Sequence, residues 1–219
     1  MNFRVQECLA KATSRAKSDV ANKLISMLLH EVSRKVCSRL QLSVGDTAYS
    51  DSVAILFGSA CCYCGLQLEA NIAVVEHPDG MNRIRAGLHI PGNALLACRK
   101  CNNEKRRDDQ KENLVLASTG WESFLSHDGM RCEQSCKTCQ YWAQKFSDPI
   151  EKMKHLGDTR KRIGEFRQEQ TRFLEVADRL RPALLARLNF LYRECQDFAT
   201  NRIRSTADSL FSEIPEESF

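Results

Sequence analysis

Apolar residues recur at helical spacing in two long stretches, one near each end of the chain. Between residues 3 and 42 they lie three or four positions apart, as Val20, Leu24 and Met27 illustrate. This spacing predicts helix, with lysines and arginines along its polar face. Ser18-Asp19 could cap a second helix, so the alternatives are two helices or one helix with a break.

The second stretch covers residues 149–212 and divides into two long segments, Thr159–Leu180 and Pro182–Phe211. Each segment carries apolar residues along one stripe, as a packed helix does. Pro182 suits the first turn of a helix, where a missing N–H is harmless. The pattern therefore predicts a C-terminal helical hairpin that packs on itself or on the N-terminal helices.

The middle of the chain has shorter patterns. Residues 52–58 form an apolar run that suits a helix end or a strand. Residues 71–76 are rich in β-branched side chains and predict a strand, which a turn at Pro78 ends. We expect residues 83–90 to return as a second strand and a short polar helix to begin near residue 102.

Composition narrows the class of protein. The chain has 219 residues, enough to bury a core, and a net charge of +4 that permits a nucleic-acid partner without requiring one. Its N-terminus lacks the apolar region of a signal peptide, and no run reaches the roughly 18 apolar residues of a membrane helix. We therefore expect a cytoplasmic protein without a membrane contact. In that reducing compartment paired cysteines more often bind metal than form disulfides.

Two Cys-x-x-Cys pairs, Cys61–Cys64 and Cys98–Cys101, are separated by 33 residues. Four thiolates at this spacing can bind one zinc ion, in a closed site that is structural rather than catalytic. Cys62 could compete as a ligand, but Cys61 leaves the usual two residues before Cys64. A second cluster contains Cys132, Cys136 and Cys139, and His127 or Cys195 could complete another zinc site. The alternative for this second cluster is a cysteine-rich surface turn.

Between the two Cys-x-x-Cys pairs lie a carboxylate and an imidazole, in Glu76-His77, and the amide of Asn93. A second amide, that of Asn102, directly follows Cys101. Such groups suit a hard metal ion and an acid–base step. Basic residues lie within and just after the second pair, where they could contact phosphates. They are Arg99, Lys100, Lys105, Arg106 and Arg107.

These residues, over about fifty of 219, resemble the motifs of the HNH, or ββα-metal, nuclease family. That family often shows Cys-x-Tyr-Cys-Gly, an acid–His pair, an Asn, and then Cys-x-x-Cys-Asn-x-x-Lys. The resemblance implies that Glu76 and Asn102 bind one divalent cation, Mg²⁺ or Mn²⁺, and that His77 is the general base. It implies that Asn93 braces the loop that orients the histidine. Glu76 replaces the more usual Asp or His, and His89 offers an alternative base.

We therefore predict a mostly helical α+β protein with a small zinc-bound ββα-metal nuclease core. The expected regions are N-terminal helices (1–50), the nuclease core (51–118), a cysteine-rich connector (119–148) and the C-terminal helical region (149–219).

The expected function is metal-dependent endonuclease cleavage of nucleic acid, with DNA favoured over RNA. Restriction or phage defence is a natural setting by analogy. The alternative is a non-catalytic zinc-dependent module, with the same fold, that binds nucleic acid or a partner. The long helices suit a homodimer or a helical protein partner.

Overall fold

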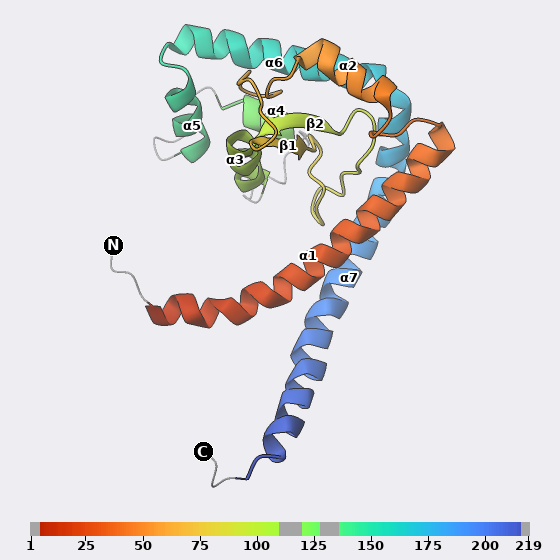
Figure 1. Cartoon of the computed structure of the whole chain (residues 1–219), viewed down its shortest axis with the longest axis vertical. Helices are drawn as coiled ribbons and strands as arrows, with labels where there is room; N and C mark the ends of the chain where they lie inside the picture. The colour runs from red at the N-terminus through yellow and green to blue at the C-terminus, as the bar shows by residue number, and fades with distance from the viewer. Residues whose placement is uncertain (1–4, 110–119, 128–135, 216–219) are drawn as a thin grey trace.

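The computed structural model describes residues 5–109, 120–127 and 136–215, which are mostly helical around one small sheet (Figure 1). This arrangement confirms the α+β class. The described elements are α1 (Val5–Leu40), α2 (Thr47–Phe57), β1 (Ala73–Glu76), β2 (Leu95–Cys98), α3 (Arg99–Asp109), α4 (Gly120–Leu125), α5 (Lys137–Lys145), α6 (Pro149–Glu169) and α7 (Thr171–Ser212). None of the described helices combines the length and the apolar content that crossing a bilayer requires.

The N-terminal region forms one helix, because α1 continues through Ser18. The two-helix alternative is therefore wrong. The buried residues of α1 include Ala21, Ile25 and Leu29, whereas Val20 is 60% exposed. Helical spacing therefore predicted this element correctly, and the buried Ile25 and Leu29 pack against α7 and the loop between the strands.

The α1–α7 core lies where these two long helices cross (Figure 1). Its buried residues are Ile25, Leu29, Val36 and Cys37 from α1, Ala86, Leu88 and Ile90 from the loop between the strands, and Phe173, Ala177, Leu184 and Leu188 from α7. Apolar residues of the loop are therefore buried by helices, although the loop itself has no regular structure.

The sheet has two antiparallel strands, β1 and β2, with Glu76 opposite Leu95. The predicted second strand over residues 83–90 is wrong, because that segment forms turns and irregular backbone. Leu88 and Ile90 look strand-like in the sequence because they are apolar, yet they are buried in the α1–α7 core. The true partner of β1 is the short run that leads into the second cysteine pair.

The C-terminal helices break at Gln170 and not at Pro182, which lies inside α7. Gln170 has a non-helical backbone, with φ −103° and ψ 19°. The loop before β2 approaches this break closely, since a Cβ on Gly92 would lie 2.8 Å from that of Gln170. A hairpin that packs on itself is therefore wrong, but the predicted packing on the N-terminal helices is confirmed: α6 runs beside α2, and α7 turns away to cross α1 (Figure 1).

An aromatic core surrounds the two Cys-x-x-Cys pairs and lies between the sheet and the helices α2, α4, α5 and α6. Its largest members are Tyr49, Phe57, Tyr63, Trp121, Phe124, Tyr141, Trp142 and Phe166. The rings of Phe124 and Trp142 are 4.7 Å apart, and those of Tyr63 and Phe124 are 5.2 Å apart. These contacts place the cysteine-bearing loop against α4, which in turn packs on α5, and both helices are distant from the loop in the sequence.

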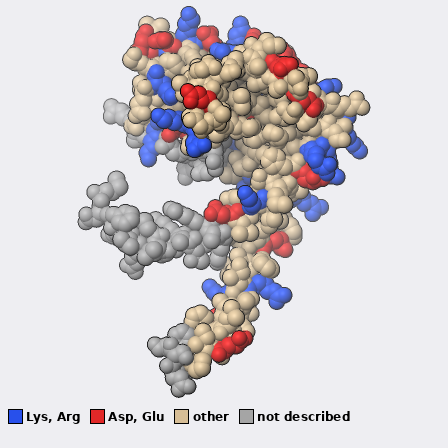
Figure 2. Space-filling model, in the orientation of Figure 1, with Lys and Arg blue, Asp and Glu red and all other residues tan. Residues whose placement is uncertain are grey.

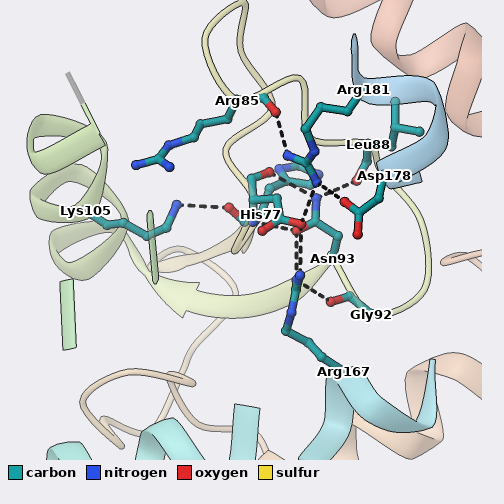
Figure 3. Close-up of polar contacts among 10 residues, drawn as sticks. His77, Arg85, Leu88, Gly92, Asn93, Lys105, Arg167, Asp178 and Arg181 are labelled. Atoms are coloured by element: carbon teal, nitrogen blue, oxygen red, sulfur yellow. Dashed lines mark hydrogen bonds and ion pairs between the residues drawn. The ribbon is translucent and has the colours of Figure 1, made fainter. Parts of the chain in front are cut away.

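Two arginines hold the loop between the strands in place (Figure 3). Arg167 of α6 lies 2.9 Å from the Asp79 carboxylate and Arg181 of α7 lies 3.5 Å from it, and that carboxylate is buried. Arg167 also donates to the carbonyl of Gly92, and Arg181 donates to that of Arg85. Both long C-terminal helices are thereby tied to the loop that follows β1.

We predict that Arg167→Met lowers the free energy of unfolding by about 2 kcal/mol, because a buried charge-assisted hydrogen bond to Asp79 is lost. Urea unfolding followed by circular dichroism measures this change. Arg179→Met is the matched control, since Arg179 pairs with Glu175 on the exposed face of α7 and should cost under about 0.5 kcal/mol. Equal losses in the two variants would contradict the role given to Arg167.

Candidate metal centres and active site

Four sulfur atoms converge at the base of the sheet. Those of Cys61, Cys64, Cys98 and Cys101 all lie within 4.8 Å of one another, and Cys64 is 3.9 Å from Cys98. Zinc bound tetrahedrally to thiolates at about 2.3 Å separates the sulfurs by roughly 3.8 Å. The cluster could therefore hold a zinc ion, and Cys62 is not part of it.

The surroundings favour the ionised form of Cys64 and Cys98, whereas the pKa values of Cys61 and Cys101 are raised. Cys98 ends β2, and its sulfur accepts a hydrogen bond from the backbone N–H of Cys101 in the first turn of α3. Hydrogen bonds from the thiols of Cys101 and Cys61 lower the pKa of Cys64 to about 7. Hydrogen bonds from neighbouring thiols, that of Cys101 foremost, also lower the pKa of Cys98. Thiolates are the form that binds zinc.

Tyr141 of α5 also contacts this centre, since its hydroxyl lies 2.7 Å from the sulfur of Cys101. Burial and the nearby Cys101 sulfur raise the pKa of Tyr141, so the hydroxyl keeps its proton and can donate it to a thiolate. No local pattern predicts this contact, because forty residues separate the two side chains.

Glu76 ends β1 as a buried carboxylate with three partners. Lys105 Nζ lies 2.9 Å from one oxygen and Tyr63 donates to the same oxygen at 3.1 Å. Asn102 donates to the other oxygen at 2.7 Å, so the two predicted cation ligands are adjacent. Tyr63 was missed by the sequence reading, although it lies within the first cysteine motif.

Lys105 does not occupy the exposed position that a phosphate contact would need. Its side chain is 2% exposed, and its ammonium group pairs with Glu76. It also donates to the carbonyl of His77 at 3.0 Å, from α3 toward the start of the loop (Figure 3). An ion pair buried this deeply neutralises Glu76 within the fold.

The two candidate bases are hydrogen-bonded to each other. His77 Nε2 lies 2.9 Å from His89 Nδ1, and the ring of His30 on α1 lies 5.4 Å from that of His89. Burial, together with the neighbouring His89 and Lys105, lowers the pKa of His77 to about 3. The imidazole of His77 is therefore neutral at physiological pH, as a proton acceptor must be.

Asn93 is buried beneath the loop that carries both histidines. Its side-chain oxygen accepts from the backbone N–H of Asp79 at 2.6 Å, and its amide nitrogen donates to the carbonyls of Asp79 and Leu88. It therefore ties the two ends of the loop together. This geometry suits the predicted bracing role.

A cavity of about 670 Å³ opens beside Glu76 and His77. Its lining comes from α1, β1, the loop, α3 and α7, and includes Asn22, Glu76, His77, Arg83, Asn102, Lys105 and Tyr192. The carboxylate of Glu76 and the amide of Asn102 are hard oxygen donors, and the amide group can present its oxygen in place of its nitrogen. A divalent cation at this carboxylate would have to replace Lys105 as its charge partner. His89 is not among the cavity residues.

The remaining predicted phosphate contacts are only partly described. Arg99 and Lys100 are exposed at the start of α3. The side chains of Arg106 and Arg107 lie outside the described part of the chain. On the face in view, basic and acidic residues are interspersed over the globular part (Figure 2). Among the described residues, that face therefore shows no continuous basic surface of the kind that long duplexes prefer.

Three of the predicted ligands of the second cysteine cluster lie close together. His127, Cys136 and Cys139 place their ligand atoms within 4.8 Å of one another. Cys132 lies outside the described residues, and Cys195 on α7 does not belong to the cluster.

Comparison with known proteins gives no assignment: no protein-family model matches the chain, and neither do the curated proteins or the solved structures. The functional interpretation therefore depends on the geometry of these centres.

We predict that Cys98→Ser removes one zinc ion per chain and unfolds the sheet region, because a buried four-thiolate site cannot keep its ion with three sulfurs. Elemental analysis and circular dichroism give the two readouts. Cys195→Ser is the control, since Cys195 belongs to neither cluster. A stable, zinc-free Cys98→Ser chain would refute a structural role for this centre.

The lowered pKa of His77 also predicts a pH dependence of stability. Between its ordinary value of 6.5 and about 3, the unfolded imidazole takes up a proton that the buried one does not. Acid therefore favours unfolding in this window, by up to about 1.4 kcal/mol for each pH unit. Urea unfolding between pH 7 and pH 5 should show a steeper loss for the wild type than for His77→Gln. Equal slopes would mean that His77 is not a buried neutral imidazole.

Proposed function

We propose that the chain is a metal-dependent endonuclease of the HNH type that hydrolyses phosphodiester bonds, with DNA favoured over RNA. One observation carries this proposal: Glu76, His77 and Asn102 line a single cavity where β1 meets α3. The strand–loop–strand–helix order around a four-cysteine centre supports it, because the resemblance implies that order. A setting in restriction or phage defence belongs to the proposal by analogy alone.

In the proposed reaction, His77 takes a proton from the attacking water. Its Nε2 is directed at His89, which leaves Nδ1 to accept the proton. If Nε2 carries the proton and forms a hydrogen bond through it to His89 Nδ1, the tautomer of His77 is fixed with an unprotonated Nδ1. A pKa of about 3 makes a weak base, but the negative charge of a bound phosphate raises the pKa of a nearby imidazole. His89 is then a positioning residue rather than the base.

Glu76 and Asn102 would hold one Mg²⁺ or Mn²⁺ ion at the cavity. When bound, that ion stabilises the charge that develops on the phosphate and on the leaving oxygen. Arg83 also lines this cavity, with its guanidinium 4.3 Å from the centre of the Tyr192 ring. Together with the exposed Arg99 and Lys100, Arg83 supplies positive charge for the nucleic-acid backbone.

A second candidate function is supported by the Glu76–Lys105 ion pair. A carboxylate that is already neutralised inside the fold needs no cation, so the same architecture also suits a zinc-dependent binding module without catalysis. Binding of nucleic acid that is unaffected by Mg²⁺, without any cleavage, is the result that this alternative predicts.

The deciding experiment is a cleavage assay on the purified full-length chain. Plasmid DNA, the same DNA with modified bases, and RNA are each incubated with Mg²⁺, with Mn²⁺ and with EDTA. Metal-dependent cleavage that EDTA abolishes supports the nuclease. Binding by gel shift without cleavage in any arm supports the alternative.

We predict that His77→Ala lowers the cleavage rate at least about 100-fold, because loss of a general base costs roughly 10²–10⁴. His89→Ala should cost about tenfold or less, since it removes only a group that orients the base. Zinc content and circular dichroism should match the wild type in both variants. Full activity in His77→Ala, with activity lost in His89→Ala, would reverse the two roles.

A further inference from the structure

Three side chains outside the proposed active site converge on one point. The Nδ1 atom of His127 lies 3.3 Å from the sulfur of Cys136 and 3.7 Å from that of Cys139. All three ligand atoms lie within 4.8 Å of one another. The imidazole is buried, with 9% of its surface exposed, although histidine is often found at the surface.

These distances match a shared metal ion better than separate hydrogen bonds. A single imidazole nitrogen offers one donor or one lone pair, so it cannot bond well to two thiols at once. A tetrahedral zinc ion, with Zn–S near 2.3 Å and Zn–N near 2.0 Å, places sulfur and nitrogen roughly 3.5 Å apart. The two observed separations, 3.3 Å and 3.7 Å, lie on either side of that value.

The elements that carry the three ligands are short and benefit from a cross-link. His127 follows α4, which has only 6 residues. Cys136 immediately precedes α5, which has 9, and Cys139 lies in its first turn. Helices of this length are not stable alone. Trp142 of α5 donates to the backbone carbonyl of Phe124 in α4 at 2.9 Å, so the two helices already lie together. A metal ion at the end of both would fix their separation.

We propose that His127, Cys136 and Cys139 bind a second, structural zinc ion. Each thiol gives up its proton on binding, and His127 binds as the neutral imidazole through Nδ1. Cys136 immediately precedes α5, where the helix N-terminus favours a thiolate. The fourth tetrahedral position remains for water or another side chain. This site does not depend on the proposed nuclease activity.

The second ion would also support the first centre. Cys139 and Tyr141 lie on the same helix, and the Tyr141 hydroxyl is 2.7 Å from the sulfur of Cys101. Fixing α5 against α4 therefore holds a hydrogen-bond donor on a ligand of the four-cysteine centre. Supporting contacts of this kind commonly affect metal affinity 10- to 100-fold.

The test is the zinc stoichiometry of the full-length chain, purified without chelators and measured by elemental analysis against amino-acid quantification. We expect two zinc ions per wild-type chain and one in Cys139→Ser and in His127→Gln. Cys195→Ser, which changes a cysteine outside both clusters, should keep two. One zinc ion in the wild type, or two in Cys139→Ser, would overturn the proposal.

X-ray absorption at the zinc edge gives an answer that needs no variant to fold. The two centres together contain six thiolates and one imidazole. The wild-type spectrum should therefore contain the scattering of a histidine ring. A spectrum of sulfur ligands alone would rule out His127 as a ligand. In a folded Cys139→Ser chain the histidine signal should disappear while a four-sulfur spectrum remains.

Discussion

The convergence of four thiols is the constraint on which the centre of this protein depends. Two strands of four residues cannot bury enough apolar surface to be stable by themselves. Cys61 and Cys64 come from the loop after α2, whereas Cys98 and Cys101 come from β2 and α3. Joining these segments fixes the end of the sheet against the first turn of α3. The carboxylate at the end of β1 and the amide on α3 then become neighbours, and the aromatic core of α2, α4, α5 and α6 closes around them.

Glu76 illustrates how stability and chemistry compete for the same atoms. Its carboxylate is almost inaccessible to water, so its charge must be compensated from within the protein. Lys105, Tyr63 and Asn102 provide this compensation, and the ammonium group of Lys105 is the principal charge. A divalent cation would serve the same electrostatic purpose and would also be able to bind phosphate. Catalysis at this site therefore requires a divalent cation to compete with the ammonium group of Lys105 for the Glu76 carboxylate.

The long helices stabilise the loop that bears both histidines. That loop has no regular secondary structure, so its shape is set by side chains from elsewhere. Asp79 accepts from Arg167 and Arg181, which come from α6 and α7, while Asn93 links its two ends. Leu88 and Ile90 are anchored in the α1–α7 core. Helices that lie far from the cavity in the sequence thereby determine where His77 and His89 meet.

The sequence alone determined the features that depend on local spacing. The two Cys-x-x-Cys pairs predicted the four-sulfur cluster, and period-3.6 patterns predicted the long helices, because ligand spacing and helical period are properties of neighbouring residues. Only the tertiary structure decided which segment pairs with β1, since residues 83–90 and Leu95–Cys98 both carry apolar side chains. Those of residues 83–90 pack against α1 and α7, whereas Leu95–Cys98 pairs with β1. It also decided the helix break at Gln170, the burial of Lys105 and the bond between His77 and His89. Each of these joins residues that are remote in the chain, and their approach is fixed by the shared cores and the sulfur cluster rather than by any local pattern.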